Sequence, residues 1–189
     1  MNGWPRLIAL SGLAGSGKTT AAKMLIQNGY QQVKFAGVLK DMCRAMGMSE
    51  SMIEGDLKEL PHPALCGKSP RRVMQLLGTE FGRNMIGEDL WVNFWLPEQA
   101  KFPRVVVDDC RMPNEANAVH AAGGLVIRLV RTDVPTTTTS TGHESEDLDR
   151  TTYNLIVENC GTDRFLLRLV ATLNDFKRGE FAQRHANSA

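Results

Sequence analysis

Residues 12–19 read Gly12-Leu13-Ala14-Gly15-Ser16-Gly17-Lys18-Thr19. They fit the pattern G-x-x-x-x-G-K-[ST] at every fixed position, which is typical of a loop that binds the phosphates of a nucleoside triphosphate. The glycines allow main-chain conformations in which successive N–H groups point at phosphate oxygens. Lys18 adds an ammonium group for the phosphates, and Thr19 adds a hydroxyl for Mg²⁺. The pattern predicts a nucleoside triphosphate with Mg²⁺ and does not indicate what receives the phosphoryl group.

The segments on either side of this loop match the structure that the loop requires. Residues 6–11 form a short apolar run typical of a buried strand, and residues 17–28 have the composition of a helix. A helix that begins at the loop also directs the positive end of its dipole at the bound anion. A glycine-rich turn that binds nothing is the alternative, and the strand-loop-helix context favours the phosphate loop.

Strand-like and helix-like segments alternate through the rest of the chain. We predict strands at 6–11, 31–35, 104–108, 125–130 and 154–157, and helices at 17–28, 36–47, 70–84, 88–100, 112–122 and 162–178. This alternation predicts an α/β, three-layer P-loop NTPase fold, with a central parallel sheet of about five strands flanked by helices. We expect a single domain over 1–189, with an acceptor-binding insertion at about 36–101, a lid at about 131–150 and a frayed tail at about 180–189.

Composition excludes several classes of protein. The net charge of the 189 residues is +1, which argues against a large surface for binding duplex nucleic acid. The four cysteines lack the spacing of a zinc site, as expected for reduced thiols in a cytosolic protein. No apolar run approaches the ~20 residues that span a bilayer, and no secretory signal is visible. We therefore expect a cytoplasmic protein with neither a membrane nor a nucleic-acid partner.

A second candidate site follows the apolar run Val105–Val107. Asp108 and Asp109 come directly after this predicted strand, where P-loop proteins place a carboxylate near Mg²⁺. The alternative is that they cap the helix that begins near residue 112. Arg111 follows them and has the geometry to clamp a phosphate, or it forms an ion pair with Asp108 or Glu115.

The predicted helix at 70–84 carries a polar stripe. Arg72, Gln75, Thr79 and Arg83 fall within one narrow arc at ~100° per residue. Such a stripe is either a solvated face or, in a protein that transfers phosphate, a site for an acceptor. Arg72 suits an acceptor phosphate, and the Gln75 amide suits the edge of a base.

Two further features have two readings each. Trp91 and Trp95 are four residues apart in a predicted helix, so they form an aromatic core stripe, or Trp91 stacks on a base. The threonine-rich run after Arg131 is a surface loop or a lid over the triphosphate.

Taken together, these segments give the chain a recognisable likeness. From the phosphate loop to about residue 175 it resembles bacteriophage-type deoxynucleoside monophosphate kinases. The resemblance is carried, beside the loop, by Phe35–Lys40, Arg72–Arg83, Asp109–Ala116, His143–Glu146 and Asn159–Thr162. Only the loop is specific by itself, but the order and spacing of the set are fairly specific.

The resemblance implies transfer of the γ-phosphoryl group of ATP to a deoxynucleoside 5′-monophosphate, for DNA precursor synthesis. It implies Mg²⁺ with ATP, and it suggests a homodimer and a phage-infected bacterial cell. The catalytic residues would then be Lys18, Arg111, Arg131 and Asp109, and the metal ligands Thr19 with Asp108 or Asp109. ATP would bind the loop residues Gly12–Thr19 (Gly12, Leu13, Ala14, Gly15, Ser16, Gly17, Lys18, Thr19) together with Thr20, Asn159 and Gly161. In this resemblance the Asn159–Thr162 turn belongs to the adenine pocket. The acceptor would bind Lys40, Arg72, Gln75, Thr79, Arg83, Trp91 and Glu115.

Two alternative functions stay open on the sequence. One is a small-molecule kinase similar to dephospho-coenzyme A kinase, which has a related C-terminal part. The other is a P-loop ATPase or switch that acts through a protein partner. A switch has no need of a second anion site, so the arginines at 72, 83 and 111 favour a kinase.

Overall fold

The computed structural model describes residues 3–132, 153–161 and 164–177. The chain divides into two compact units. The first contains the described residues of Met1–Val33 and Lys101–Ala189, and the second is Lys34–Ala100. Most of the predicted lid and the whole of the predicted tail lie outside the described residues.

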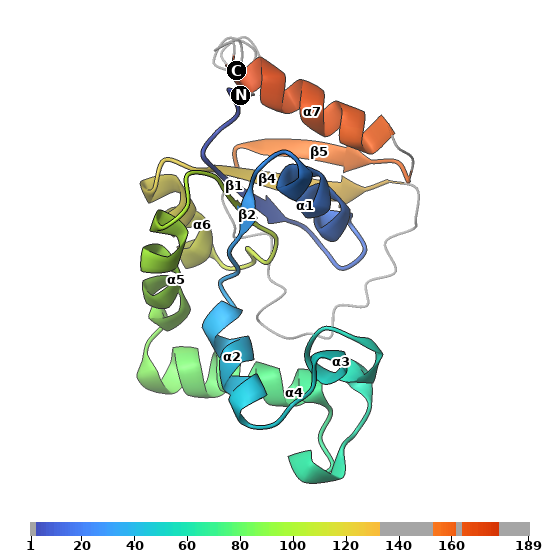
Figure 1. The fold of residues 1–189 in the computed structure, drawn as a ribbon, viewed down its shortest axis with the longest axis vertical. Helices are drawn as coiled ribbons and strands as arrows, with labels where there is room; N and C mark the ends of the chain where they lie inside the picture. Colours follow the sequence, from blue (N-terminus) through green and yellow to red (C-terminus); the bar gives the residue numbers. More distant parts are fainter. Residues whose placement is uncertain (1–2, 133–152, 162–163, 178–189) are drawn as a thin grey trace. The chain divides into compact units, whose positions relative to one another are not determined.

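A five-stranded parallel sheet forms the centre of the first unit (Figure 1). Its strands are β1 (Leu7–Ser11), β2 (Gln31–Gln32), β3 (Val105–Val107), β4 (Leu125–Arg131) and β5 (Leu155–Asn159). They lie in the order β2-β3-β1-β4-β5, and every neighbouring pair is parallel. The predicted fold class is therefore confirmed. β2 is shorter than the predicted 31–35, because the sheet pairing covers only its first two residues.

Three helices cover the two faces of this sheet. α1 (Lys18–Gln27) and α7 (Arg164–Lys177) lie against each other on one face, and α6 (Pro113–Ala121) packs against β1 and β4. Side chains of a strand alternate between faces, so Ile8 points at α1 and α7 while Leu7 points the other way. A Cβ atom at Gly124 would lie 2.7 Å from both Leu7 Cγ and Val119 Cγ1, which places Leu7 beside α6. The result is the predicted three-layer arrangement.

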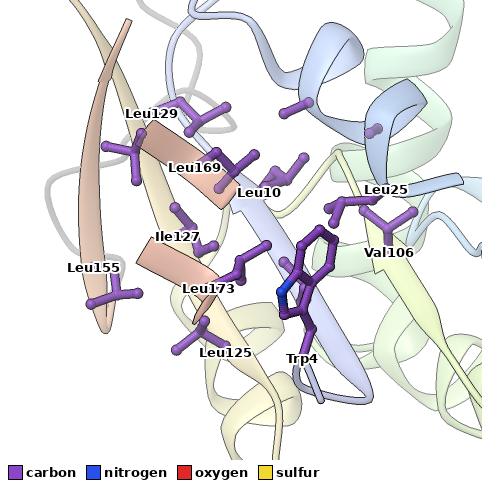
Figure 2. Close-up of a cluster of buried hydrophobic side chains, with 14 of the residues drawn as sticks. Trp4, Leu10, Leu25, Val106, Leu125, Ile127, Leu129, Leu155, Leu169 and Leu173 are labelled. Atoms are coloured by element: carbon purple, nitrogen blue, oxygen red, sulfur yellow. The ribbon is translucent and has the colours of Figure 1, made fainter. Parts of the chain in front are cut away.

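The main core lies between the sheet and the α1–α7 pair (Figure 2). Leucines of α7 meet the aliphatic side chains of β1, β4 and β5, and Leu25 of α1 lies near Val106. Each such buried side chain contributes about 1.5–3 kcal/mol relative to the exposed state. Trp4 joins this core, and its indole Nε1 donates a hydrogen bond of 2.8 Å to Asn174 Oδ1. That bond ties the N-terminal segment to α7.

The second unit is helical. It consists of α2 (Gly37–Ala45), α3 (Glu50–Ile53), two 3₁₀ turns (Asp56–Glu59 and Pro63–Leu65), α4 (Pro70–Gln75), a π-helix (η3, Leu76–Ile86) and α5 (Leu90–Ala100). Its own small core contains Cys43, Met48, Met52, Ile53, Val73 and Met74. Neither α3 nor the two 3₁₀ turns were predicted, because no strand or helix was expected between residues 47 and 70. No helix in the described part of the chain is long and apolar enough to cross a membrane.

The predicted α-helix over 70–84 is wrong in its second half. The chain winds as an α-helix only to Gln75 and then continues as a π-helix, which is a rare form that is frequent at functional sites. The wider winding changes which residues share a face. Thr79, a member of the predicted polar stripe, is buried, whereas the apolar Phe81 is 40% exposed.

Candidate active site

The phosphate loop joins β1 to α1, and its backbone requires glycine. Gly12, Gly15 and Gly17 have φ angles of 141°, 77° and 100°, which side-chain-bearing residues rarely adopt. A Cβ atom on Gly12 would also lie 2.6 Å from Ser16 Oγ and would collide with the carbonyl oxygen of Leu129. The local sequence therefore fixes the loop conformation.

Lys18 is the first residue of α1, and its side chain reaches back to the start of this loop. Its Nζ donates hydrogen bonds of 2.6 and 2.8 Å to the carbonyl oxygens of Gly12 and Leu13. Burial, helped by the positive charge of Arg111, lowers the pKa of Lys18 from 10.5 to about 8, while Asp108 and Asp109 act in the opposite direction. These charges act on Lys18 because β1 and β3 are adjacent, so their carboxyl ends meet.

The carboxyl end of β3 leads through the two aspartates into α6. Asp108 is buried, and Cys110 behind it is fully buried, which raises the pKa of its thiol well above 9.0. The first residue before α6 is Met112, so the aspartates do not cap this helix, and the capping alternative is wrong. Glu115 makes the cap: its Oε2 accepts hydrogen bonds from the backbone N–H groups of Arg111 (2.7 Å) and Met112 (3.1 Å). This buried carboxylate therefore fixes the main chain at Arg111, and its predicted contact with the acceptor stays a prediction.

A pocket of about 410 Å³ opens beside the loop. It is lined by Gly15, Gly17, Lys18, Thr19, Thr20, Arg131, Asn159, Gly161 and Phe165. All of these except Phe165 are residues that the sequence assigns to ATP or to catalysis. Phe165 is buried in the first turn of α7, and a Cβ atom on Gly17 would lie 3.3 Å from its ring. Phe165 follows Gly161 closely and lies on the apolar face of the predicted helix at 162–178. This position could have indicated from the sequence that Phe165 lines the ATP pocket.

Side chains at the ends of β4 and β5 also bind main-chain carbonyl oxygens of the phosphate loop. Arg131, the last residue of β4, donates from Nη1 to the carbonyl oxygen of Gly15 at 3.2 Å. Asn159, the last residue of β5, donates from Nδ2 to the carbonyl oxygen of Ser16 at 3.0 Å. The two residues are paired in the register of the parallel strands. Parallel pairing thus brings both side chains to the edge of the sheet where the loop lies.

The predicted acceptor residues of the second unit have different environments. Arg72 is about half exposed, and its Nη1 lies 3.8 Å from Glu80 Oε1. Arg83 donates from Nη1 to the carbonyl oxygen of Glu88 at 3.2 Å, and Gln75 is half-buried. Lys40 lies 2.6 Å from Glu54 Oε1. Burial would raise the pKa of Glu54, but Lys40 and Lys34 outweigh it and lower that pKa.

Trp91 lies in the interior of the second unit. It is 4% exposed, and its indole Nε1 donates a 2.8 Å hydrogen bond to the carbonyl oxygen of Gly78. A Cβ atom on Gly82 would lie 2.8 Å from Trp91 Cε2, so the π-helix presents a glycine where the indole packs. Trp95 is also buried and packs on Phe35, with ring centroids 4.4 Å apart. This geometry matches the aromatic core reading, and stacking of Trp91 on a base stays a prediction.

The donor set at the phosphate loop suits a magnesium ion that arrives with its nucleotide. Two carboxylates at the end of β3 and the exposed Thr19 provide hard oxygen ligands, and both carboxylates act electrostatically on Lys18. Among the described residues, no group of three or more His, Cys, Asp or Glu side chains forms a metal cage. Mg²⁺ commonly takes only one or two protein carboxylates and completes its shell with phosphate oxygens and water. The residues present therefore fit this ion.

Comparison with known proteins identifies a family and a relative that match most of the chain. The family model for deoxynucleotide monophosphate kinase matches residues 64–167. A protein of Acanthamoeba polyphaga mimivirus, named "Putative deoxynucleotide monophosphate kinase", is 30% identical, with 89% of this chain and 96% of that protein covered.

Similar solved structures include a shikimate kinase from Bacteroides thetaiotaomicron and the protein TT1252 from Thermus thermophilus. The shikimate kinase is 16% identical with a TM-score of 0.49, covering 90% of this chain and 97% of that one. TT1252 is 17% identical with a TM-score of 0.47, covering 89% and 96%.

Proposed function

This chain is a kinase that belongs to the deoxynucleotide monophosphate kinase family, and from that premise we propose that it transfers the γ-phosphoryl group of ATP to a deoxynucleoside 5′-monophosphate. The product would be the diphosphate, for use in DNA precursor synthesis. One observation carries the proposal: residues of the phosphate loop (Gly15, Gly17, Lys18 and Thr19) line a single pocket together with Arg131, Asn159 and Gly161. Such a pocket offers main-chain donors and cations to a triphosphate at one end and a turn for the base at the other.

The charges around Lys18 support direct, in-line transfer. Phosphoryl transfer depends mainly on positioning and on stabilisation of negative charge. Lys18, Arg111 and Arg131 would neutralise charge on the transferring group. Lys18 and Arg131 already bond to loop carbonyls, so both cations lie at the loop before any ligand arrives. The acceptor phosphate is anionic near neutral pH, so this reaction needs no general base.

Thr19 and one of Asp108 or Asp109 would hold Mg²⁺, directly or through water. When bound, this ion would neutralise charge on the phosphates and orient them. The burial of Asp108 and its position directly after β3 support Asp108 as the more rigidly held candidate ligand, whereas Asp109 is half-buried.

We assign the acceptor to the second unit, with Arg72 as its main phosphate ligand. The ion pair between Arg72 and Glu80 is long and exposed, and pairs of this kind contribute little to stability. Arg72 can therefore exchange Glu80 for a phosphate at small cost. Arg83, Gln75, Thr79 and Lys40 complete the proposed site, as the resemblance implies.

A coupled assay of ADP release tests this proposal. The purified protein would be given ATP and Mg²⁺ with no acceptor, with each deoxynucleoside and ribonucleoside monophosphate, and with dephospho-coenzyme A. Stimulation by deoxynucleoside monophosphates is the expected result. Stimulation by dephospho-coenzyme A alone, or slow hydrolysis that ignores every acceptor, would contradict the proposal. Comparison of the rates with the different monophosphates measures the preference for base and sugar. Sedimentation of the same sample tests the suggested homodimer.

A further inference from the structure

Asn159 makes contacts that differ from those of a residue that reads a base. The residue is only 7% exposed. Nδ2 donates to the carbonyl oxygen of Ser16 in the phosphate loop at 3.0 Å, and Oδ1 accepts from the N–H of Gly161 at 2.9 Å. Both ends of the amide are therefore engaged with the main chain, one across the fold and one within the Asn159–Gly161 turn.

The main chain of Asn159 adds a third connection. Its carbonyl oxygen accepts a hydrogen bond of 3.1 Å from the N–H of Thr132, the residue after Arg131. Asn159 thus links three segments that line or flank the pocket: the phosphate loop, the end of β4 and the turn at Gly161. A buried amide with both its donor and its acceptor satisfied stabilises the arrangement that satisfies it.

The phosphate loop is shaped to admit this amide. A Cβ atom on Gly17 would lie 2.5 Å from Asn159 Nδ2. Gly17 has a φ angle of 100°, so two separate constraints, backbone conformation and space for Asn159, favour glycine there. The loop and Asn159 fit each other across 143 residues of sequence.

We propose that Asn159 is a positioning residue for the triphosphate, which holds the phosphate loop through the Ser16 carbonyl and the adjacent turn through the Gly161 N–H. This rests on the proposed use of ATP and deepens it, because the resemblance places Asn159 with the base. In this role Asn159 orients loop N–H groups that bind phosphate, and its effect is independent of the base. Other atoms of the pocket would then contact the base.

The test compares ligands with and without a base. Binding of ATP, GTP and inorganic tripolyphosphate, each with Mg²⁺, would be measured by calorimetry for the wild-type protein and for Asn159→Ala and Asn159→Asp. Alanine removes both side-chain bonds, and aspartate keeps the acceptor for Gly161 but loses the donor to Ser16. We expect both variants to bind the ligands at least about tenfold more weakly than the wild-type protein. Within each variant, the loss of affinity should be the same for ATP, GTP and tripolyphosphate.

Asn154→Ala is the matched control. Asn154 also uses its side chain to bond main chain across β4 and β5, because its Oδ1 accepts from Val126 N–H at 2.7 Å. It lies at the other end of this strand pair and does not line the pocket. This variant should lower the melting temperature and leave tripolyphosphate affinity unchanged, which separates loss of stability from loss of positioning.

A measurement on the unchanged protein covers the case in which the Asn159 variants fail to fold. In ¹⁵N-labelled wild type, the Asn159 side-chain amide should be slow to exchange with solvent and should shift on addition of tripolyphosphate. A shift with adenosine but not with tripolyphosphate would overturn the proposal, as would a loss of ATP binding that spares GTP in the variants. Wild type that binds neither ATP nor tripolyphosphate would refute the proposed function itself, and normal binding by Asn159→Ala would refute only this inference.

Discussion

The phosphate loop of the first unit and the α4–η3 helices of the second are both assigned to phosphate groups, yet they are built differently. The loop is a main-chain structure whose carbonyls are held by Lys18, Arg131 and Asn159. The α4–η3 helices offer side chains instead. Arg72 among them is about half exposed, and its Nη1 lies 3.8 Å from Glu80 Oε1. A site made of main chain depends on local backbone geometry, whereas a site made of side chains depends on how its helix winds. Perturbations should therefore act more severely and less selectively at the loop.

Replacement of Lys18 should have the largest effect. Lys18→Ala should lower kcat/KM by on the order of a hundredfold or more, equivalent to about 3 kcal/mol, because a charge-stabilising donor is lost from a partly buried site. Steady-state kinetics at saturating acceptor measures this loss. Lys23→Ala is the control, since Lys23 is exposed on the same helix and does not line the pocket. Unchanged turnover in Lys18→Ala would contradict the proposed catalytic role of the loop.

Two glycines of the same loop should respond unequally. Gly12→Ala places a Cβ against Leu129 O and Ser16 Oγ, whereas Gly15→Ala meets nothing within 4 Å. Both substitutions carry the cost of a positive φ, about 1–2 kcal/mol, and only the first adds a collision. We expect tripolyphosphate affinity to fall roughly tenfold further in Gly12→Ala than in Gly15→Ala, by calorimetry. Equal losses would mean that space around Gly12 does not shape the loop.

Replacement of Arg72 should be selective where the loop variants are not. Arg72→Ala should raise the KM for the deoxynucleoside monophosphate by about tenfold, since a charged hydrogen bond is worth about 1.5–3 kcal/mol, and leave the KM for ATP unchanged. Arg71→Ala is the matched control, because the neighbouring Arg71 pairs with Glu59. A rise in the KM for ATP with no change for the acceptor would reverse the assignment of the α4–η3 helices.

A change of pH should have the smallest effect on triphosphate binding. This effect should arise from Lys18 in the phosphate loop and not from the α4–η3 helices. Lys18 has a pKa of about 8 in the folded protein, so raising the pH from 7 to 9 removes most of its charge and should weaken ATP binding by up to about tenfold. Calorimetry in buffers of different ionisation enthalpy should show proton uptake on binding at pH 9. Lys18→Arg should abolish this uptake, since arginine stays charged.

The same titration has a defined sign for folding. The unfolded chain keeps the Lys18 proton up to about 10.5, whereas the folded chain releases it near 8. The unfolded state therefore binds more protons between these values, and the Lys18 contribution to the free energy of unfolding should increase across that interval. A contribution that decreased there would contradict the lowered pKa.

Sequence alone determined the phosphate loop, the parallel sheet and the alternation of strands and helices. These follow from local rules: positive φ angles require glycine, and buried parallel strands such as Val105–Val107 are continuous apolar runs. It also placed Lys18 near the β3 aspartates, because parallel strands end at one edge of a sheet.

Tertiary structure decided what local rules leave open. The change from α- to π-helix at Leu76 accompanies the packing of Trp91 on Gly82, a contact that no helical periodicity encodes. Glu115 rather than an aspartate caps α6, because its carboxylate accepts hydrogen bonds from the N–H groups of Arg111 and Met112. The bond from Asn159 to Ser16 joins residues 143 apart in the chain. The Asn159–Ser16 contact exists only once the sheet has formed, because its partners are brought together by strand order rather than by their spacing in the sequence.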